Sequence, residues 1–465
     1  MSDEPDDSGE ADDQTVSRDR SLRARWIRLR AVLTHTTPAK LLLLGYLSYI
    51  ALGWILLSLP FAQATAVPAI DNLFIATSAV STTGLVSVDP GSSYTFFGQL
   101  VILLLIQLGG LGYMTVGSFV VLTAQDRMSR LRREATKNAF NLPDDVKPKL
   151  FIRSVVRFTL ICEVIGAAVL YVMFRQQGVE DALWSAIFHS ISAFCTAGFS
   201  LFSNSFESFG AHAGITLTIS ALSILGAMGF LIVVDASRTL SGRSPHLGFT
   251  SKVIIRLTLL FLLIGTVILM VVEPGIAALP ANERLLTAFF QVMTASTTVG
   301  FNTYPISALS HSVLIVFFFL MVIGASPAGT GGGLKTTSFA ALIGLVRSTL
   351  KGRDRIRFFK REIPLQRLQD ATAGLAYYLV LLAGAMFLLF LTEADAAFDV
   401  VMFEVISALG TVGLSMGLTG ELSDLGKLIV VGLMTAGRVG ILTFGIALAT
   451  HDESREEEQD NDLVL

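Results

Sequence analysis

The sequence predicts an all-α integral membrane protein in which four similar repeats surround a central pore. Three observations lead to this fold class. Hydrophobic residues make up 52% of the 465 residues and charged residues only 15%, whereas ordinary soluble domains carry about 25% charged residues. The basic residues gather in separate clusters, and a short motif recurs four times between long apolar segments. A mean hydropathy of +0.65 is too high for a chain that keeps its whole surface in water.

The basic clusters predict how the chain crosses the membrane. They lie at 18–40, 127–157, 238–256 and 347–367 and contain 28 of the 34 Lys and Arg residues. Loops rich in Lys and Arg stay on the cytoplasmic side, so the chain should leave and return between consecutive clusters and once more after the last. This pattern predicts eight spanning helices and two cytoplasmic termini, in a multi-pass protein of the cell inner (plasma) membrane.

A spanning helix needs roughly 20 mostly apolar residues. Apolar segments of about this length lie between the basic clusters and after the last one. The outward segments are 41–59, 153–174, 253–272 and 373–392. The returning segments are 97–123, 213–234, 312–343 and 427–449. The third returning segment is too long for one span and is interrupted by Gly and Pro. Residues 1–17 are acidic, which argues against a cleavable signal peptide.

A repeated motif stands between each outward and returning segment. It reads SAVSTTGLV at 78–86, SAFCTAGFS at 192–200, TASTTVGFN at 294–302 and SALGTVGLS at 407–415. The motif glycines are 114, 102 and 113 residues apart, and a Phe stands ten residues before each of them. Four copies in equivalent places indicate an internal repeat.

Each copy predicts a half-helix that enters the membrane and turns back. The roughly ten apolar residues before each Gly are too few to span a membrane. Non-helical backbone at membrane depth needs partners for its polar groups, which four turns around a pseudo-four-fold axis supply together. Their carbonyls would line one path, and the negative ends of the half-helices would favour a cation there. The alternative, that Gly only permits close helix packing, better fits Gly109 and Gly226.

The turns therefore predict a cation filter, lined by four residues from each copy. Gly supplies unusual backbone conformations, and Thr supplies a hydroxyl. The predicted filter residues are Ser81, Thr82, Thr83 and Gly84; Cys195, Thr196, Ala197 and Gly198; Thr297, Thr298, Val299 and Gly300; and Gly410, Thr411, Val412 and Gly413.

Other classes of protein find little support. No catalytic constellation stands out, so the chain is predicted not to be an enzyme. The two cysteines, Cys162 and Cys195, lack metal-ligand spacing. A net charge of −3 gives no support for nucleic-acid binding. Residues 324–338 nearly match a phosphate-binding loop, but Leu334 stands where that motif has Gly before Lys335, so no nucleotide is expected on this chain.

The four turns, together with QLGGLGYMT (107–115), GASPAGTGGGLKTTSF (324–339) and GRVGILTF (437–444), resemble the TrkH/TrkG/KtrB superfamily of potassium transporters, which is related to plant HKT proteins. The resemblance covers roughly residues 38–450 and is closest to KtrB. It implies a K⁺-conducting subunit, a homodimer, and a cytosolic ring of nucleotide-binding regulatory subunits of the KtrA/TrkA type. Gly at all four turns implies K⁺ as the ion, with Na⁺ as an activator left open.

Five glycines and a proline in residues 324–338 cannot continue a helix. The resemblance implies that this break is a loop that gates the pore beneath the filter. A simple kink is the alternative. The predicted gate residues are Gly329, Thr330, Gly331, Gly332, Gly333, Lys335 and Arg438.

Two basic residues at membrane depth can each be interpreted in two ways. Arg438 either faces the pore as a barrier to cations or forms an ion pair with Asp235 or Glu163. Lys335 either belongs to the gate or extends to the interface. The polar residues on the half-helices are expected to form local hydrogen bonds rather than to bind ions; they are His189, Gln291 and Glu404.

The predicted function is K⁺ uptake by channel-like passage through the filter. The alternatives are an Na⁺-permeable or Na⁺-coupled transporter of the same fold, and an alternating-access carrier. The basic loops would also offer a docking surface for the regulatory ring or for anionic membrane lipid. The predicted divisions are the tail 1–37, repeat 38–126, basic loop 127–150, repeat 151–235, loop 236–250, repeat 251–346, basic loop 347–369, repeat 370–450 and acidic tail 451–465.

Overall fold

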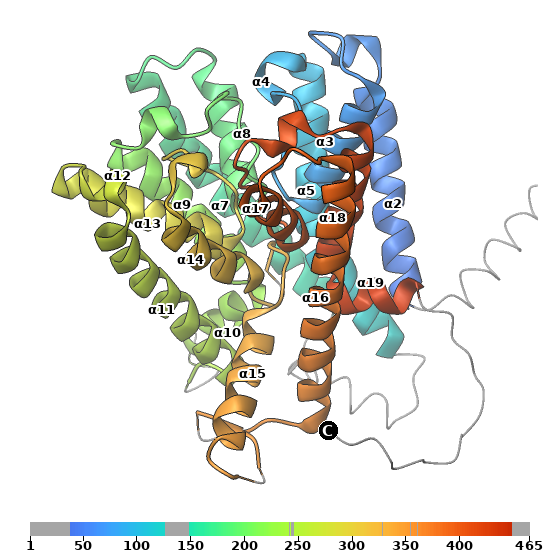
Figure 1. Ribbon diagram of the computed structural model, residues 1–465, viewed down its shortest axis with the longest axis vertical. Helices are drawn as coiled ribbons and strands as arrows, with labels where there is room; N and C mark the ends of the chain where they lie inside the picture. Colours follow the sequence, from blue (N-terminus) through green and yellow to red (C-terminus); the bar gives the residue numbers. More distant parts are fainter. Residues whose placement is uncertain are drawn as a thin grey trace, which may run out of the picture.

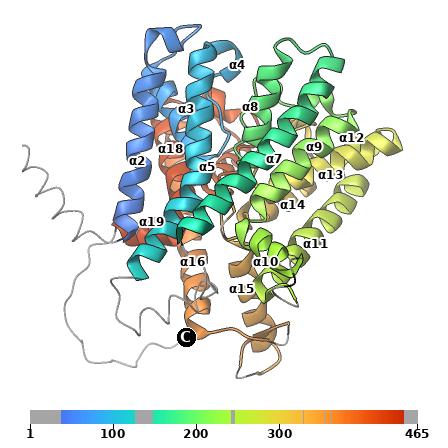
Figure 2. The same ribbon diagram turned by 180° about the vertical axis from the view of Figure 1, so that it is seen from behind.

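The computed structural model describes residues 38–125, 148–240, 242, 246–327, 329–353, 355–359 and 361–448. Within them the chain is helical apart from one short antiparallel hairpin, in which β1 (Arg357–Phe358) pairs with β2 (Arg361–Glu362). Figure 1 shows long helices running along one axis, with α15 and α10 toward one end and α4 and α12 toward the other. Figure 2 shows the same arrangement from behind.

The described helices fall into four groups around the four motif copies, each with a long first helix, a shorter helix leading into the motif and a returning segment after it. The first repeat contains α2 (Pro38–Leu57), α3 (Ala69–Ser81) and α5 (Phe96–Gln125). The second contains α7 (Pro148–Gln176), α8 (Ala182–Phe194), α9 (Ala213–Ala227) and α10 (Phe230–Leu240). The third contains α11 (Phe249–Val272), α13 (Ala281–Thr297), α14 (His311–Val322) and α15 (Thr336–Thr349). The fourth contains α16 (Leu365–Thr392), α17 (Phe398–Gly410), α18 (Asp424–Val439) and α19 (Ile441–Leu448).

Short elements connect these helices. They are α4 (Pro90–Ser93), α12 (Pro274–Ala277) and the 3-10 turns η1 (Pro60–Ala62), η2 (Glu207–Phe209), η3 (Ile306–Ala308) and η4 (Leu418–Glu421).

Three of the four returning segments are broken. The chain bends by 90° between α9 and α10 and by 107° between α18 and α19. The prediction of continuous helices over 213–234 and 427–449 is therefore wrong, because Gly229 (φ 82°) and Gly440 (φ 98°) adopt a left-handed backbone that ends an α-helix. The third returning segment is interrupted, as the sequence suggested, by residues 323–335, which we call the Gly-rich loop.

The lengths and apolar character of the helices fit a membrane protein. Three of the described helices are long and apolar enough to cross a membrane, at 154–176, 249–272 and 365–392, and the count becomes five if each bent pair forms one span. Their outer surfaces carry exposed large apolar side chains such as Ile165, Leu263 and Phe387. The eight crossings stay a prediction.

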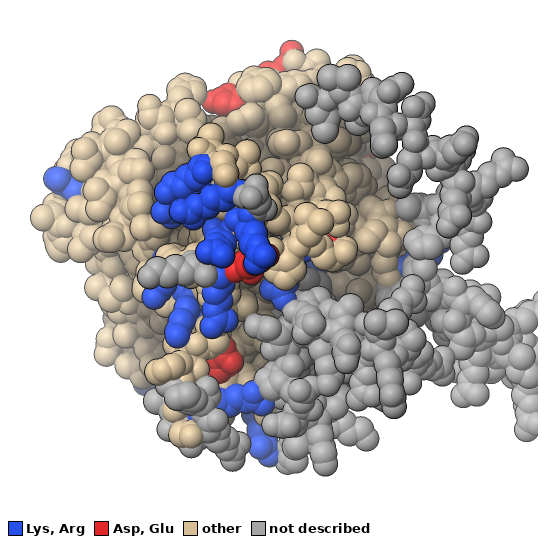
Figure 3. Space-filling view, turned by 90° about the horizontal axis from the view of Figure 1, so that it is seen from below, with Lys and Arg blue, Asp and Glu red and all other residues tan. Residues whose placement is uncertain are grey.

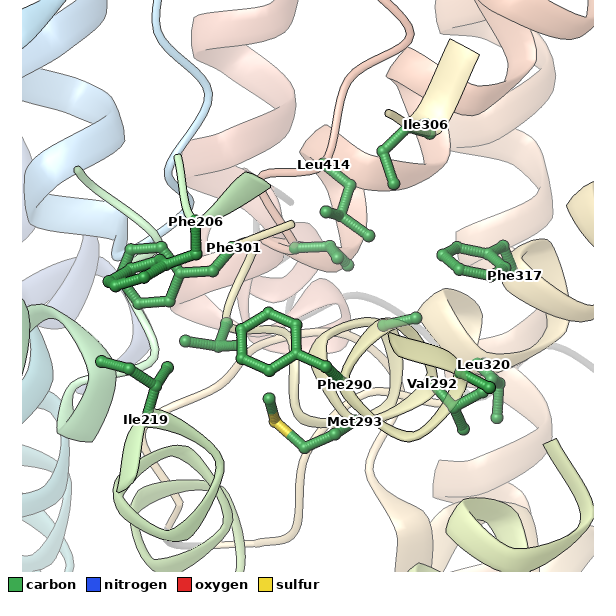
Figure 4. Packing of buried hydrophobic residues seen from close by; sticks show 14 of the residues in the cluster. Phe206, Ile219, Phe290, Val292, Met293, Phe301, Ile306, Phe317, Leu320 and Leu414 are labelled. Atoms are coloured by element: carbon green, nitrogen blue, oxygen red, sulfur yellow. The ribbon is translucent and has the colours of Figure 1, made fainter. Parts of the chain in front are cut away.

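The core lies where the short helices approach one another. The Phe that precedes each motif glycine is fully buried, at 74, 188, 290 and 403. Figure 4 shows Phe290 and Met293 of α13 packed near Phe206 and Phe301, which come from segments beyond the short helices. This apolar packing fixes the ends of the short helices, and so the turns that follow them.

A buried ion pair joins the last repeat to the first. The Nζ atom of Lys427, in the first turn of α18, lies 2.6 Å from Oδ1 of Asp71, in the first turn of α3. The two side chains are only 12% and 5% exposed. The pair therefore joins the last group of helices to the first.

Breaking this pair should destabilise the protein. Because Asp71→Asn leaves a buried lysine charge without its partner, we expect it to lower the free energy of unfolding by about 3 kcal/mol. Thermal unfolding in detergent measures the loss. The double variant Asp71→Leu/Lys427→Met should recover most of it, and a single variant as stable as the parent would contradict a structural role.

Exposed basic side chains gather on one end of the molecule, around the hairpin and the ends of α15 and α11. Figure 3 shows this surface, which we call the basic face. Arg256 and Arg361 lie over the rings of Phe359 and Phe249, which ties the hairpin to α11. The basic face comprises Lys252, Arg256, Arg347, Lys351, Arg353, Arg355, Arg357 and Arg361.

Candidate ion-conduction site

Each short helix ends in the same backbone turn. The threonine of the motif adopts the left-handed conformation in all four copies: Thr82 (φ 49°), Thr196 (φ 50°), Thr298 (φ 57°) and Thr411 (φ 50°). The amide after it donates back to a carbonyl five residues earlier, as in the bond of 2.9 Å from Thr83 N to Ser78 O. This is the Schellman pattern, which satisfies the last carbonyls of a helix.

Threonine is an unusual residue in this conformation. A left-handed backbone suits Gly or Asn and is a genuine outlier for a β-branched residue. Such strain costs about 1–3 kcal/mol at each position and persists only where the surrounding structure imposes it. It occurs in all four turns, and strained residues of this kind cluster at functional sites.

The four glycines form a closed ring. A Cβ atom placed on Gly84 would lie 3.1 Å from Cα of Gly198, one on Gly198 would lie 3.1 Å from Cα of Gly300, and one on Gly300 would lie 3.1 Å from Cα of Gly413. A Cβ atom on Gly413 would lie 3.0 Å from Cα of Gly84, which completes the circuit. Each turn therefore touches the next, in chain order, and none leaves room for a side chain at its glycine.

The other predicted filter residues occupy two environments. The backbone of Thr83, Ala197, Val299 and Val412 lies against the neighbouring glycine of the ring. By contrast, the side chains of Ser81 and Thr297 contact groups of their own turn or half-helix. Ser81 Oγ lies 2.6 Å from Thr83 Oγ1, and Thr297 Oγ1 donates to Met293 O over 2.7 Å. The Sγ atom of Cys195 instead donates to Gln107 Oε1 of α5, over 3.7 Å, and to Glu163 Oε1 of α7, over 3.9 Å. Gly410 is the last residue of α17 and lies against the carbonyl of Met321.

A cavity of about 310 Å³ opens on one side of the ring. All four glycines line it, together with Asp89 and Glu207. Asp89 Oδ2 accepts a hydrogen bond of 2.5 Å from Ser203, and Glu207 Oε1 accepts one of 2.6 Å from Asn302. Two carboxylates in a concave surface raise the local concentration of cations.

Polar residues nine positions before the ring glycines hold the segments that follow them. His189 Nε2 accepts a hydrogen bond of 3.2 Å from Leu201 N, and Gln291 Nε2 donates one of 2.8 Å to Tyr304 O. Glu404 accepts hydrogen bonds from Ser415, over 2.9 Å, and from Thr419. The prediction of local hydrogen bonds for these three residues is confirmed. The first repeat has Ile75 at this position.

In three of the four copies the first residue of the motif, a serine, also supports the turn, a role that the sequence interpretation missed. Gly84 N donates to Ser78 Oγ and Gly413 N donates to Ser407 Oγ, each over 3.1 Å. Ser192 Oγ donates to Phe199 O over 2.9 Å. The signal was present in the sequence, since each of the four motifs begins with Ser or Thr six residues before Gly.

The Gly-rich loop lies directly against the four left-handed threonines. Thr196 Oγ1 donates to Thr330 Oγ1 over 2.9 Å, and Thr82 Oγ1 donates to Thr330 O over 3.4 Å. A Cβ atom on Gly331 would collide with Thr298 Oγ1, and one on Gly332 would collide with Thr411 Oγ1. The loop therefore covers the side of the ring opposite the acidic cavity.

Two basic side chains hold the Gly-rich loop against the ring. Lys335 Nζ donates to Gly331 O over 2.8 Å, so this side chain turns toward the loop. The guanidinium of Arg438 donates to Thr330 O and, over 2.6 Å, to Gly109 O in α5. Arg438 is 2% exposed.

The remaining predicted gate residues and ion-pair partners also have defined places. Gly329 lies against the carbonyl of Ala227, and Gly333 adopts φ 69°. Asp235 accepts a hydrogen bond of 2.5 Å from Ser251, and Glu163 accepts one of 3.3 Å from Gln107. The carbonyl contacts of Arg438 were not foreseen from the sequence.

Sequence comparison finds transport proteins over most of the chain. A family model described as "TrkH: Cation transport protein" matches residues 50–459. The chain is 36% identical to "Ktr system potassium uptake protein B" of Vibrio alginolyticus, over 88% of this chain and 91% of that protein. It is 32% identical to the protein of the same name from Bacillus subtilis (strain 168), over 97% and 99%. It is 34% identical to "Potassium/sodium uptake protein NtpJ" of Enterococcus hirae, over 91% and 95%.

A solved structure shares the fold. The crystal structure of the potassium transporter TrkH from Vibrio parahaemolyticus superposes with a TM-score of 0.65 at 22% sequence identity, covering 87% of this chain and 84% of that one.

Proposed function

The chain belongs to the TrkH family of cation transport proteins, and from this we propose that it is the ion-conducting subunit of a potassium uptake system in a cell membrane. The observation that carries the proposal is the closed ring of Gly84, Gly198, Gly300 and Gly413. The relatives named above as potassium uptake proteins support K⁺ as the ion.

We infer that backbone carbonyls of the ring replace the hydration shell of K⁺. In each turn a left-handed threonine and a left-handed glycine are separated by one ordinary residue. This alternation turns successive carbonyls to the same side of the chain, which is the arrangement of a carbonyl-lined filter. The C-terminal ends of four half-helices add partial negative charge at the ring.

The direction of transport follows from the charges at the two ends. The basic face lies inside and the acidic cavity outside, by the positive-inside rule. Asp89 and Glu207 then concentrate cations at the outer mouth. The inside-negative membrane potential supplies about 2.3 kcal/mol per charge for each 100 mV, which is enough to drive uptake without bond chemistry.

The Gly-rich loop acts as the gate in this proposal. It lies between the ring and the inner side, against all four left-handed threonines, and its glycines permit close contact without a fixed helical path. Movement of the loop away from the ring would open the inner mouth. A cytosolic regulatory subunit, docked on the basic face of a homodimer, would shift the loop between these positions.

A second candidate is transport of both K⁺ and Na⁺. It is favoured by the similarity to the Enterococcus hirae protein whose name includes both ions. The two candidates share the fold and the ring and differ only in how strongly the ring prefers K⁺.

The substitution Gly84→Ser tests the proposal. Because a Cβ atom at position 84 would lie 2.5 Å from the carbonyl oxygen of Ala197 and φ is 94° there, the ring cannot keep its shape. We expect K⁺ uptake to fall about tenfold, for a distortion costing roughly 1–3 kcal/mol, and the ratio of K⁺ to Na⁺ uptake to fall as well. Uptake of K⁺, Rb⁺ and Na⁺ in a host without its own K⁺ transporters measures both.

The matched control is Gly420→Ala, at a position where an added Cβ meets nothing within 4 Å. Unchanged uptake and selectivity in Gly84→Ser would exclude the ring as the filter. Equal uptake of K⁺ and Na⁺ by the parent protein would favour the second candidate.

A further inference from the structure

A second large cavity lies away from the ring, between α14, α15 and α16. Its volume is about 680 Å³, within the range of about 300–1,000 Å³ that holds small organic ligands. The walls are apolar and include Phe319, Val322, Leu334, Phe339 and Ile343. Water gains little from such walls, so an apolar occupant is favoured.

The cavity opens on the outer flank of α15 and carries charge at one end. Val346 and Leu350, which border it, are 57% and 82% exposed. Arg347 and Lys351 also border it and belong to the basic face. They are four residues apart on α15 and so project from the same side of the helix. Within the described residues, neither forms an ion pair with a carboxylate.

We propose that this cavity binds one anionic phospholipid of the inner leaflet. An acyl chain fills the apolar part, and the phosphate lies against Arg347 and Lys351. The two cations at the mouth of an apolar cavity match this ligand class, because an anionic phospholipid combines both chemistries and is abundant on the cytoplasmic side of membranes. A zwitterionic lipid carries a cation beside its phosphate, which weakens its attraction to the two basic residues. A second apolar helix would use the walls without using the paired charge.

The cavity touches the base of the Gly-rich loop. Leu334 and Val322 both line it, and Leu334 N donates to Val322 O over 3.2 Å. The next residue, Lys335, holds the loop through Gly331 O. An acyl chain packed on Leu334 contacts the loop in its present position. A ligand that binds only one conformation of a protein stabilises that conformation. The lipid therefore holds the loop under the ring and lowers flux; this effect rests on the proposed function, whereas the lipid site does not.

Native mass spectrometry of the purified chain, titrated with phosphatidylglycerol or phosphatidylcholine, tests the site. Each basic residue near a membrane surface contributes about 1 kcal/mol, so Arg347→Gln/Lys351→Gln should weaken phosphatidylglycerol binding about 30-fold. The control Arg353→Gln/Arg355→Gln removes two exposed charges from the same face but not from the cavity, and should leave binding unchanged. Ser338→Phe, which fills the cavity without changing charge, should also displace the lipid.

Three results would overturn the site: equal binding of the two lipids by the parent chain, equal loss in both double variants, or disulfide cross-linking between copies through Leu350→Cys. The last would mean that a second copy covers the cavity. In vesicles, K⁺ flux through the parent should fall as phosphatidylglycerol replaces phosphatidylcholine, whereas flux through Arg347→Gln/Lys351→Gln should not respond. A flux of zero in every variant, with lipid binding as expected, would refute the proposed function and leave the lipid site standing.

Discussion

The substitution Gly332→Ala is expected to raise K⁺ flux about tenfold. A Cβ atom at this position would collide with Thr411 Oγ1 in the fourth turn, so alanine is incompatible with the present position of the Gly-rich loop. Overpacking of this kind costs about 1–3 kcal/mol, and about 1.4 kcal/mol is a tenfold change in the balance between two positions of the loop. Rb⁺ flux into vesicles measures the change.

Two controls separate a displaced loop from a distorted filter. Gly432→Ala adds the same methyl group in α18, where it meets nothing within 4 Å, and should leave flux unchanged. If the loop moves and the ring does not, the preference for K⁺ over Na⁺ should be the same in Gly332→Ala as in the parent. A flux equal to that of the parent, or a lower one, would contradict a gate that closes by contact with Thr411.

The repeated turns could be predicted from the sequence because their physics is local. A threonine and a glycine at fixed spacing after an apolar run of about ten residues define the same helix end in each copy. Four copies between long apolar segments then imply a common arrangement. The structure places the glycines at 84, 198, 300 and 413 against one another, and the proposed filter is built on that ring.

The bends at Gly229 and Gly440 could not be predicted in the same way. Both glycines stand within apolar segments, and an isolated Gly in such a segment is compatible with a continuous membrane helix. Whether the chain bends depends on tertiary contacts around the bend. Sequence periodicity contains no information on those contacts.

Local hydrogen bonds could be predicted for the polar residues of three half-helices, but the chemical variety of these residues hid the role that they share. His189, Gln291 and Glu404 share one position relative to the ring glycines but differ in charge and shape, and Ile75 takes that place in the first repeat. Their common role is to bond the backbone or hydroxyls of the following segment, which only the geometry reveals. Hydrogen bonds between residues far apart in sequence, such as those of Arg438, likewise depend on the packed fold.

The contacts of Arg438 lead to a third interpretation of this residue, as a tether for the Gly-rich loop. Its guanidinium joins the carbonyl of Thr330 in the loop to that of Gly109 in α5. A hydrogen bond from a charged group contributes about 1.5–3 kcal/mol. Arg438→Ala removes both bonds, so we expect it to release the loop and raise K⁺ flux about tenfold or more.

Arg438→Lys distinguishes the tether from an electrostatic barrier. Lysine keeps the positive charge but lacks the planar fork that reaches two carbonyls at once. If Arg438 acts as a tether, the lysine variant should conduct nearly as well as the alanine variant. If it acts as a barrier, the lysine variant should stay close to the parent. The amount of protein in the membrane must be measured for each variant, since a loss there would indicate a structural role instead.

Combining Arg438→Ala with Gly332→Ala completes the argument, because a tether can act only while the loop is in place. Once Gly332→Ala has displaced the loop, removal of Arg438 should add little, and the two effects on flux should be strongly non-additive. A barrier would act on the ion and not on the loop, so the two increases would multiply. Multiplied effects would therefore refute the tether, even if each single variant conducts more than the parent.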